Sequence, residues 1–186
     1  MTAKAISDQQ LKAFFSTIDV DNSGTLTPTE LQRVLLNGDW SPFNLDTIKL
    51  LFSLFDHDGN GTITFNEFMG LWRYIEDWKH IFSTFDKDNN GTIEIPELNT
   101  AMRSFGFNIS EQMLKKLVRK YKISHNIQGK KLMTDDLEHA ISFDNFVQLC
   151  VTVKSLTDVF RTLDQTGTGW AKMNYETFME VVFKNK

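Results

Sequence analysis

The sequence has few of the features that indicate a secreted, membrane-spanning or disulfide-bonded protein. It contains one cysteine and three prolines in 186 residues, and no run of about eighteen apolar residues. The single cysteine, Cys150, cannot form an internal disulfide, and its apolar surroundings favour core packing over a role as a nucleophile. The first residues, MTAKAISDQQ, lack the apolar stretch of a signal peptide. We therefore expect no transmembrane helix and a reducing, cytoplasmic environment.

Two further classes of function lack their sequence signals. No cysteine–histidine pairing, phosphate-cradling glycine loop or catalytic triad pattern is readable, so we do not expect an enzyme. The formal net charge is −4 and no recognition motif for nucleic acid occurs, so nucleic acid is not an expected partner. One helical stretch, LKKLVRKYK, carries basic residues on one side, namely Lys115, Lys116, Arg119 and Lys120. We interpret it as a solvated face, with acidic lipid or an acidic partner as the alternative.

A twelve-residue pattern, in contrast, occurs three times: DVDNSGTLTPTE at 19–30, DHDGNGTITFNE at 56–67 and DKDNNGTIEIPE at 86–97. Each copy has aspartate at its first and third positions, serine or asparagine at the fifth, glycine at the sixth, an apolar residue at the eighth and glutamate at the twelfth. These are the requirements of an EF-hand loop, in which oxygens from alternate positions surround Ca²⁺ and glycine permits the sharp turn. Ordinary solvent-exposed turns would not fill every key position three times.

The predicted ligands are the side chains at the first, third, fifth and twelfth positions and the backbone carbonyl at the seventh. They are Asp19, Asp21, Ser23, Thr25 and Glu30 in the first loop, Asp56, Asp58, Asn60, Thr62 and Glu67 in the second, and Asp86, Asp88, Asn90, Thr92 and Glu97 in the third. Mg²⁺ is the expected competitor, and a permanently filled structural site is the alternative to a responsive one. The third site is expected to bind most tightly, because Glu94 adds a carboxylate at its ninth position.

Helical periodicity flanks these loops and predicts an all-α fold of five hands within a single domain, residues 1–186. The predicted hands span about residues 8–37, 45–75, 76–106, 110–150 and 153–184. Only eighteen residues separate Glu67 from Asp86, so one continuous helix is expected to join the second and third hands. A second shared helix is expected between the fourth and fifth hands. The apolar eighth positions, Leu26, Ile63 and Ile93, would pair the loops through short β-bridges.

The fourth and fifth hands depart from the pattern. Where a fourth loop is due, Lys122 cannot hold a cation, Asn145 stands in place of the closing glutamate, and an insertion at 124–140 lengthens the loop. We interpret that insertion as a solvated segment and the fourth hand as one without metal. The fifth loop begins with Asp164 but has threonine at its third and fifth positions and Tyr175 at its twelfth. Weak or absent calcium binding is expected there.

Five hands, a fourth without its ligands, a degenerate fifth and two shared helices resemble the penta-EF-hand family. The resemblance covers residues from about 7 to 183. It implies that hands one and two pair, that three and four pair, and that the fifth pairs with the fifth hand of a second subunit. That dimer face would use Phe178, Met179, Val181, Val182 and Phe183. The family usually carries a Gly/Pro-rich N-terminal tail, whereas this chain begins almost directly at its first helix.

These features predict a calcium-responsive adaptor that exposes an apolar surface and recruits a protein or a membrane. Three bound Ca²⁺ ions would change the formal net charge from −4 to +2, which would favour calcium-dependent association with anionic lipid. Two alternatives stay open: a calcium buffer or granule-storage protein, and the non-catalytic subunit of a heterodimeric enzyme. The target protein, and whether the second subunit is identical, cannot be read from the sequence.

Overall fold

The computed structural model describes residues 6–123, 140–164 and 166–184. The chain falls into two compact units, Met1–Val147 and Gln148–Lys186. The insertion predicted at 124–140 lies outside the described residues except for Ala140. None of the helices within the described ranges has the length and apolar character needed to cross a membrane.

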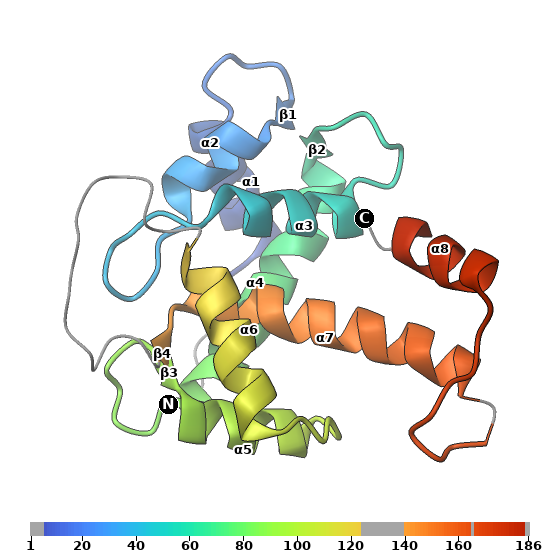
Figure 1. Ribbon diagram of the computed structural model, residues 1–186. Coiled ribbons are helices and arrows are strands. Elements are labelled where there is room, and N and C mark those ends of the chain that lie inside the picture. Colours follow the sequence, from blue (N-terminus) through green and yellow to red (C-terminus); the bar gives the residue numbers. More distant parts are fainter. Residues whose placement is uncertain (1–5, 124–139, 165, 185–186) are drawn as a thin grey trace. The chain divides into compact units, whose positions relative to one another are not determined.

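The first unit opens with two helix–loop–helix hands. The elements are α1 (Asp8–Ile18), β1 (Thr25–Leu26), α2 (Pro28–Val34), α3 (Leu45–Phe55), β2 (Ile63–Thr64) and α4 (Phe65–Phe85). The two short strands are antiparallel, with Leu26 opposite Ile63 (Figure 1). The apolar eighth positions of the first two loops therefore meet as expected. Helix α4 runs without interruption for 21 residues, which confirms the shared helix between hands two and three.

The third and fourth hands follow in the same unit. They comprise β3 (Ile93–Glu94), α5 (Ile95–Ser104), α6 (Glu111–Ile123), β4 (Ala140–Ile141) and the start of α7 (Phe143–Leu163). Ile93 lies opposite Ile141 in the antiparallel pair β3–β4 (Figure 1). The pairing identifies Ile141 as the eighth position of the fourth loop, although the preceding loop residues lie outside the described part of the chain. The mostly helical class with small β-bridges is thus confirmed.

Local capping explains where these helices begin. Ser7 precedes α1, and its backbone N–H donates to Oε1 of Gln10 at 3.0 Å, while the Gln10 backbone N–H donates to Ser7 Oγ at 3.3 Å. This reciprocal capping box satisfies two donors that a helix start leaves free. Helices α2 and α4 begin in the same way, with Thr27 and Thr64 as caps. The last residues of each calcium-type loop therefore form the first turn of the helix that follows.

The core of the first unit is rich in phenylalanine. Phe68 is fully buried on α4 and packs edge-on against Phe15 of α1, with ring centroids 5.4 Å apart. Phe82, near the end of α4, packs against Phe143 and Phe146 at 5.4 and 5.5 Å. Each buried phenylalanine stabilises the fold by about 1.5–3 kcal/mol relative to exposure. Helix α4 therefore contributes to the cores of both hand pairs, which gives it a structural role along its whole length.

The second unit contains the rest of α7, the fifth loop and α8 (Tyr175–Lys184). Helix α7 is 21 residues long and supplies the shared helix expected between the fourth and fifth hands. Cys150 is buried on it, and burial raises the pKa of its thiol, so it packs as an apolar residue and does not act as a nucleophile. Trp170 and Tyr175, in the fifth hand, are highly exposed.

Candidate metal centres

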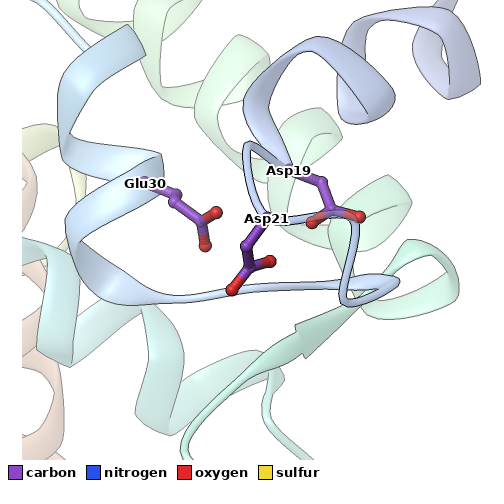
Figure 2. Close-up of side chains that lie close together, drawn as sticks. All are labelled: Asp19, Asp21 and Glu30. Atoms are coloured by element: carbon purple, nitrogen blue, oxygen red, sulfur yellow. The ribbon is translucent and has the colours of Figure 1, made fainter.

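Three acidic clusters occupy the three predicted loops. They are Asp19, Asp21 and Glu30, which form the first site, Asp56, Asp58 and Glu67, which form the second, and Asp86, Asp88 and Glu97, which form the third. In each site, one carboxylate oxygen from every residue lies within 4.8 Å of the others. Figure 2 shows Asp19 and Asp21 in the loop after α1 and Glu30 on the first turn of α2, with their carboxylates drawn together. Residues that lie eleven positions apart thus meet around one small volume.

The first aspartate of each loop organises the turn around it. Oδ2 of Asp19, Asp56 and Asp86 accepts a hydrogen bond from the backbone N–H of the sixth-position glycine, at 2.9, 2.8 and 3.0 Å respectively. Those glycines have φ angles of +81, +79 and +79°, a left-handed conformation that glycine adopts with little strain. The aspartate and glycine types at these two positions are therefore both required by the fold of the loop.

The closing glutamate joins the two ends of each loop. In the first site, Oε1 of Glu30 accepts from the backbone N–H of Val20 at 3.1 Å, and Oε2 accepts from that of Thr27 at 2.9 Å. Glu67 and Glu97 repeat both contacts at distances between 2.9 and 3.1 Å. The same carboxylate therefore caps a helix and faces the aspartates. The loop pattern predicts the role of the glutamate toward the metal but not its capping role, which the T-x-x-E spacing at 27–30 and 64–67 signals.

Hydrogen bonds lower the pKa of four of the loop carboxylates. The pKa of Asp21 is lowered by hydrogen bonds from the Ser23 hydroxyl and backbone N–H, and the pKa of Glu30 by those from the Thr27 backbone and hydroxyl. The pKa of Glu67 is lowered mainly by the Thr64 backbone N–H. For Asp56, burial acts to raise the pKa, but hydrogen bonds led by the Gly61 N–H outweigh it and the net shift is downward. Protons therefore compete weakly for these oxygens at neutral pH.

The fifth and seventh positions also lie against each other, as the predicted ligand order requires. Asn60 Oδ1 accepts from the backbone N–H of Thr62 at 2.7 Å, and Asn90 Oδ1 accepts from that of Thr92 at 2.8 Å. In the first loop the Ser23 hydroxyl donates to the Thr25 carbonyl at 2.9 Å. Glu94, which was expected to add a carboxylate to the third site, is exposed and is not one of its three clustered carboxylates.

The donor set fits a hard divalent cation. Every converging group is an oxygen, and three negative charges within 4.8 Å of one another repel strongly unless a cation lies among them. Carboxylate, amide and carbonyl oxygens at these loop positions are the ligands that Ca²⁺ takes in flexible geometry, whereas Mg²⁺ demands a tighter octahedron. The arrangement is therefore suited to binding Ca²⁺ directly from solution, with Mg²⁺ as a weaker competitor.

The fifth loop keeps the turn but has a carboxylate at only the first of the three clustered positions. Asp164 Oδ2 accepts from the backbone N–H of Gly169 at 2.7 Å, the same contact that the three acidic loops make. The third and fifth positions are Thr166 and Thr168, whose hydroxyls lie 2.9 Å apart. Among the described residues, acidic clusters of three form only at the three sites above.

The EF-hand family models match the part of the chain that contains the three acidic loops. The EF-hand domain pair family matches residues 8–73, and the EF hand domain family matches residues 77–105. Sorcin of Schistosoma japonicum is 36% identical over 173 residues, which cover 93% of this chain and 94% of that protein. Peflin of Xenopus laevis is 32% identical over 172 residues, or 92% of this chain, but the match spans only 57% of peflin.

The fold has a counterpart among solved structures. A homolog of programmed cell death 6 protein from Leishmania major Friedlin superposes with a TM-score of 0.74 at 28% identity, covering 96% of this chain and 95% of that chain. With the sorcin match, this likeness extends over nearly the whole chain and includes the two hands that departed from the loop pattern. The chain belongs to the penta-EF-hand family. Its EF-hand loops and acidic clusters make it a calcium-binding protein.

Proposed function

We propose that the first, second and third sites each bind one Ca²⁺ ion through the fifteen residues predicted from the loop pattern. The observation that carries this proposal is the convergence of three carboxylates within 4.8 Å in each loop. The closing glutamate supplies two oxygens in such a shell, while the seventh-position threonine supplies its backbone carbonyl. The fourth and fifth hands serve as structural partners and bind calcium weakly or not at all.

In this proposal, calcium binding makes the protein act as a regulatory adaptor. In sensor EF-hands, coordination by the closing glutamate reorients the helix that leaves the loop and exposes an apolar groove. Here the closing glutamates lie on the first turns of α2, α4 and α5. A change in their position acts directly on those helices and on the phenylalanine core that α4 carries. The exposed surface recruits a protein target, and the adaptor itself has no catalytic activity.

A fluorescence assay separates this adaptor from a calcium buffer. We expect an apolar-surface dye to brighten when calcium replaces chelator, because helix reorientation uncovers core residues. The matched control is the triple variant Glu30→Gln, Glu67→Gln, Glu97→Gln, which should show no change. Calcium uptake by calorimetry without any dye response would contradict the adaptor and favour the buffer or storage function.

We further propose dimerisation through the fifth hand. An odd number of hands leaves one without an intramolecular partner, and symmetric pairing with a second copy covers such a face. Phe178 on α8 is 50% exposed and Val182 is 38% exposed, which supports an apolar contact there. Phe178→Asp should therefore convert the dimer to a monomer in sedimentation velocity. Leu54→Asp, which places the same charge at a 43% exposed leucine on α3, is the control and should stay dimeric. A monomeric parent protein would contradict this part of the proposal.

Co-purification with a different, larger chain would instead favour the alternative function, that of the non-catalytic subunit of a heterodimeric enzyme.

Membrane association is the second proposed outcome of calcium binding. Three Ca²⁺ ions add six positive charges, so the formal net charge changes from −4 to +2. That change removes the electrostatic repulsion from anionic lipid and supports calcium-dependent recruitment of a cytoplasmic protein. Sedimentation with phosphatidylserine vesicles should pull down more protein in calcium than in chelator. Equal binding in both conditions would contradict this outcome and leave protein recruitment as the function.

A further inference from the structure

The segment between the first two hands, residues 35–44, makes contacts that the EF-hand pattern does not require. This segment, which we call the interhand linker, connects α2 to α3 and folds back on itself through a β-bridge between Leu36 and Pro42. At Gly38 its backbone touches the third calcium-type loop. A Cβ atom placed on Gly38 would lie 3.3 Å from Cα and 3.5 Å from the carbonyl oxygen of Gly91. Gly91 is the sixth residue of that loop, so the linker rests on the turn that organises the third site.

The same linker is hydrogen-bonded to the fourth hand. The backbone N–H of Asp144 donates to Oδ1 of Asn37 at 3.0 Å, and the backbone N–H of Asn44 donates to Oδ2 of Asp144 at 2.6 Å. Asp144 is fully buried and Asn37 is 5% exposed, so water does not compete for these bonds. The linker is thus held at both ends against the start of α7, with Gly38 between the two attachments.

The first site reaches the linker through α2. Two residues after the closing Glu30, the Gln32 Nε2 atom donates to the backbone carbonyl of Phe43 at 2.8 Å. The Phe43 ring packs edge-on against Phe143 at 5.6 Å, and Phe143 packs against Phe82 at 5.4 Å. Phe82 also accepts, through its backbone carbonyl, the N–H of Asp86 at 2.9 Å, and Asp86 is the first residue of the third loop. A continuous chain of packed and hydrogen-bonded groups therefore joins Glu30 to Asp86.

We propose that the interhand linker couples the first and third sites, so that Ca²⁺ at either one raises the affinity of the other. The inference rests on the proposed assignment of both sites as calcium sites. When Glu30 coordinates Ca²⁺, it fixes the position of α2. Helix α2 holds Phe43 through Gln32, and the linker then presses Gly38 against the turn of the third loop. Because coupling of binding equilibria is reciprocal, calcium at the third site favours closure of the first to the same degree.

A second structural path also joins the first and third sites, through the second site, and its contribution must be separated from that of the linker. Strands β1 and β2 connect the first loop to the second, and α4 connects the second loop to the third. Silencing the second site with Glu67→Gln removes calcium-dependent closure along that route. Glutamine at this position keeps one acceptor oxygen for the Thr64 backbone N–H and hydroxyl, so α4 keeps its start. All measurements are therefore made in the Glu67→Gln background.

Calorimetry in that background measures the coupling directly. Adding Glu97→Gln leaves the first site alone, and adding Glu30→Gln leaves the third site alone, so each gives a one-site association constant. The overall two-ion constant of the background protein, divided by the product of those constants, is the coupling factor. We expect a factor of at least about 5, the lower end of typical allosteric coupling. The whole set is repeated with Gln32→Ala, and with Arg33→Ala as the control on the neighbouring exposed residue of α2.

Gln32→Ala should reduce the coupling factor to below about 2, because the link from α2 to Phe43 is lost, whereas Arg33→Ala should leave it unchanged.

Gly38→Ala is a second, independent variant. The φ angle of Gly38 is not left-handed, so alanine is tolerated locally, but the added Cβ must displace the Gly91 turn. It should also lower the factor, with thermal unfolding confirming that the variant folds. A background factor near 1, or a factor that survives both variants, would overturn the inference while leaving the calcium sites intact. Failure of the one-site variants to bind calcium would instead contradict the proposed ligand assignment.

Discussion

Glu97 combines two roles that a single substitution can separate. Its carboxylate faces Asp86 and Asp88 in the third site, and it also accepts hydrogen bonds from the backbone N–H groups of Lys87 and Glu94 at 3.0 and 3.1 Å. Glutamine keeps one acceptor oxygen, which suffices for the Glu94 capping contact, but it loses the second acceptor, the charge and the bidentate metal contact.

Glu97→Gln should therefore lower the calcium affinity of the third site by more than about 100-fold, beyond the loss caused by removing an outer-shell partner. Isothermal calorimetry should record one fewer tight site, and circular dichroism should show an unchanged helix content. Glu111→Gln, an exposed glutamate on α6 paired with Lys115, is the matched control and should bind as the parent does. Unchanged stoichiometry and affinity in Glu97→Gln would refute the role of this residue.

The lowered pKa values of the loop carboxylates predict how calcium binding responds to acid. The pKa values of Asp21, Glu30, Asp56 and Glu67 lie below their ordinary values, which are about 3.9 for aspartate and 4.3 for glutamate. Protonation displaces Ca²⁺, so affinity must fall as pH falls, but only where these groups gain protons. Competition titrations should show nearly constant affinity from pH 8 to about pH 5.5 and a steep loss below about pH 4.5. A loss centred near pH 6.5, well above the ordinary carboxylate pKa values, would contradict this.

Among the helices, α4 carries the most demanding structural role. It begins with the closing turn of the second site, ends at the first aspartate of the third site, and buries Phe68 and Phe82 in the cores of both hand pairs. Glu76 lies near its middle with an exposed side chain. Replacing Glu76 by proline removes a helical hydrogen bond and clashes with the preceding turn.

Glu76→Pro should destabilise the protein by about 3 kcal/mol or more, measured as the free energy of unfolding in urea. Glu76→Ala removes the same side chain and its contact with Lys79 at 3.4 Å, and should change stability by less than about 0.5 kcal/mol. A Glu76→Pro variant as stable as Glu76→Ala would show that α4 does not act as one continuous element.

The elements differ in how far they could be predicted from the sequence. The three loops, α1 and α4 follow from local spacing alone, because each ligand position and each apolar position lies within about one loop or helix of the next. The attachment of the interhand linker does not, since Asn37 and Asn44 bond to Asp144 across 107 and 100 residues. Asparagine in a short connection is typical of turns, so nothing local marks these two as anchors.

Some features of the metal sites could likewise be predicted from the sequence, and others could not. The carboxylates that converge were all predicted, because the metal chemistry fixes their spacing. The contribution of Glu94 was predicted from its loop position but remains a prediction, since its carboxylate is not part of the cluster in the third site. Asn145 at the fourth closing position is buried, yet the loop that would face it lies outside the described residues. The metal content of the fourth hand therefore also remains a prediction.

At the scale of the whole molecule, the protein is a penta-EF-hand chain in which acidic loops are built into a phenylalanine-rich helical core. We propose that filling the loops changes both the charge of the molecule and the position of the helices that begin at the closing glutamates. In this proposal the two consequences act together: the apolar surface provides affinity for a target, and the altered charge determines which surfaces the molecule approaches. Both depend on the same three acidic clusters.

A calcium titration of the purified protein by isothermal calorimetry tests this dependence most directly. We expect uptake of three Ca²⁺ ions per chain with dissociation constants of about 10⁻⁷–10⁻⁵ M, and none at that affinity in the triple variant Glu30→Gln, Glu67→Gln, Glu97→Gln. If the parent protein takes up no calcium at millimolar concentration, or if the triple variant binds as the parent does, the acidic clusters are not calcium sites and the proposed function is wrong.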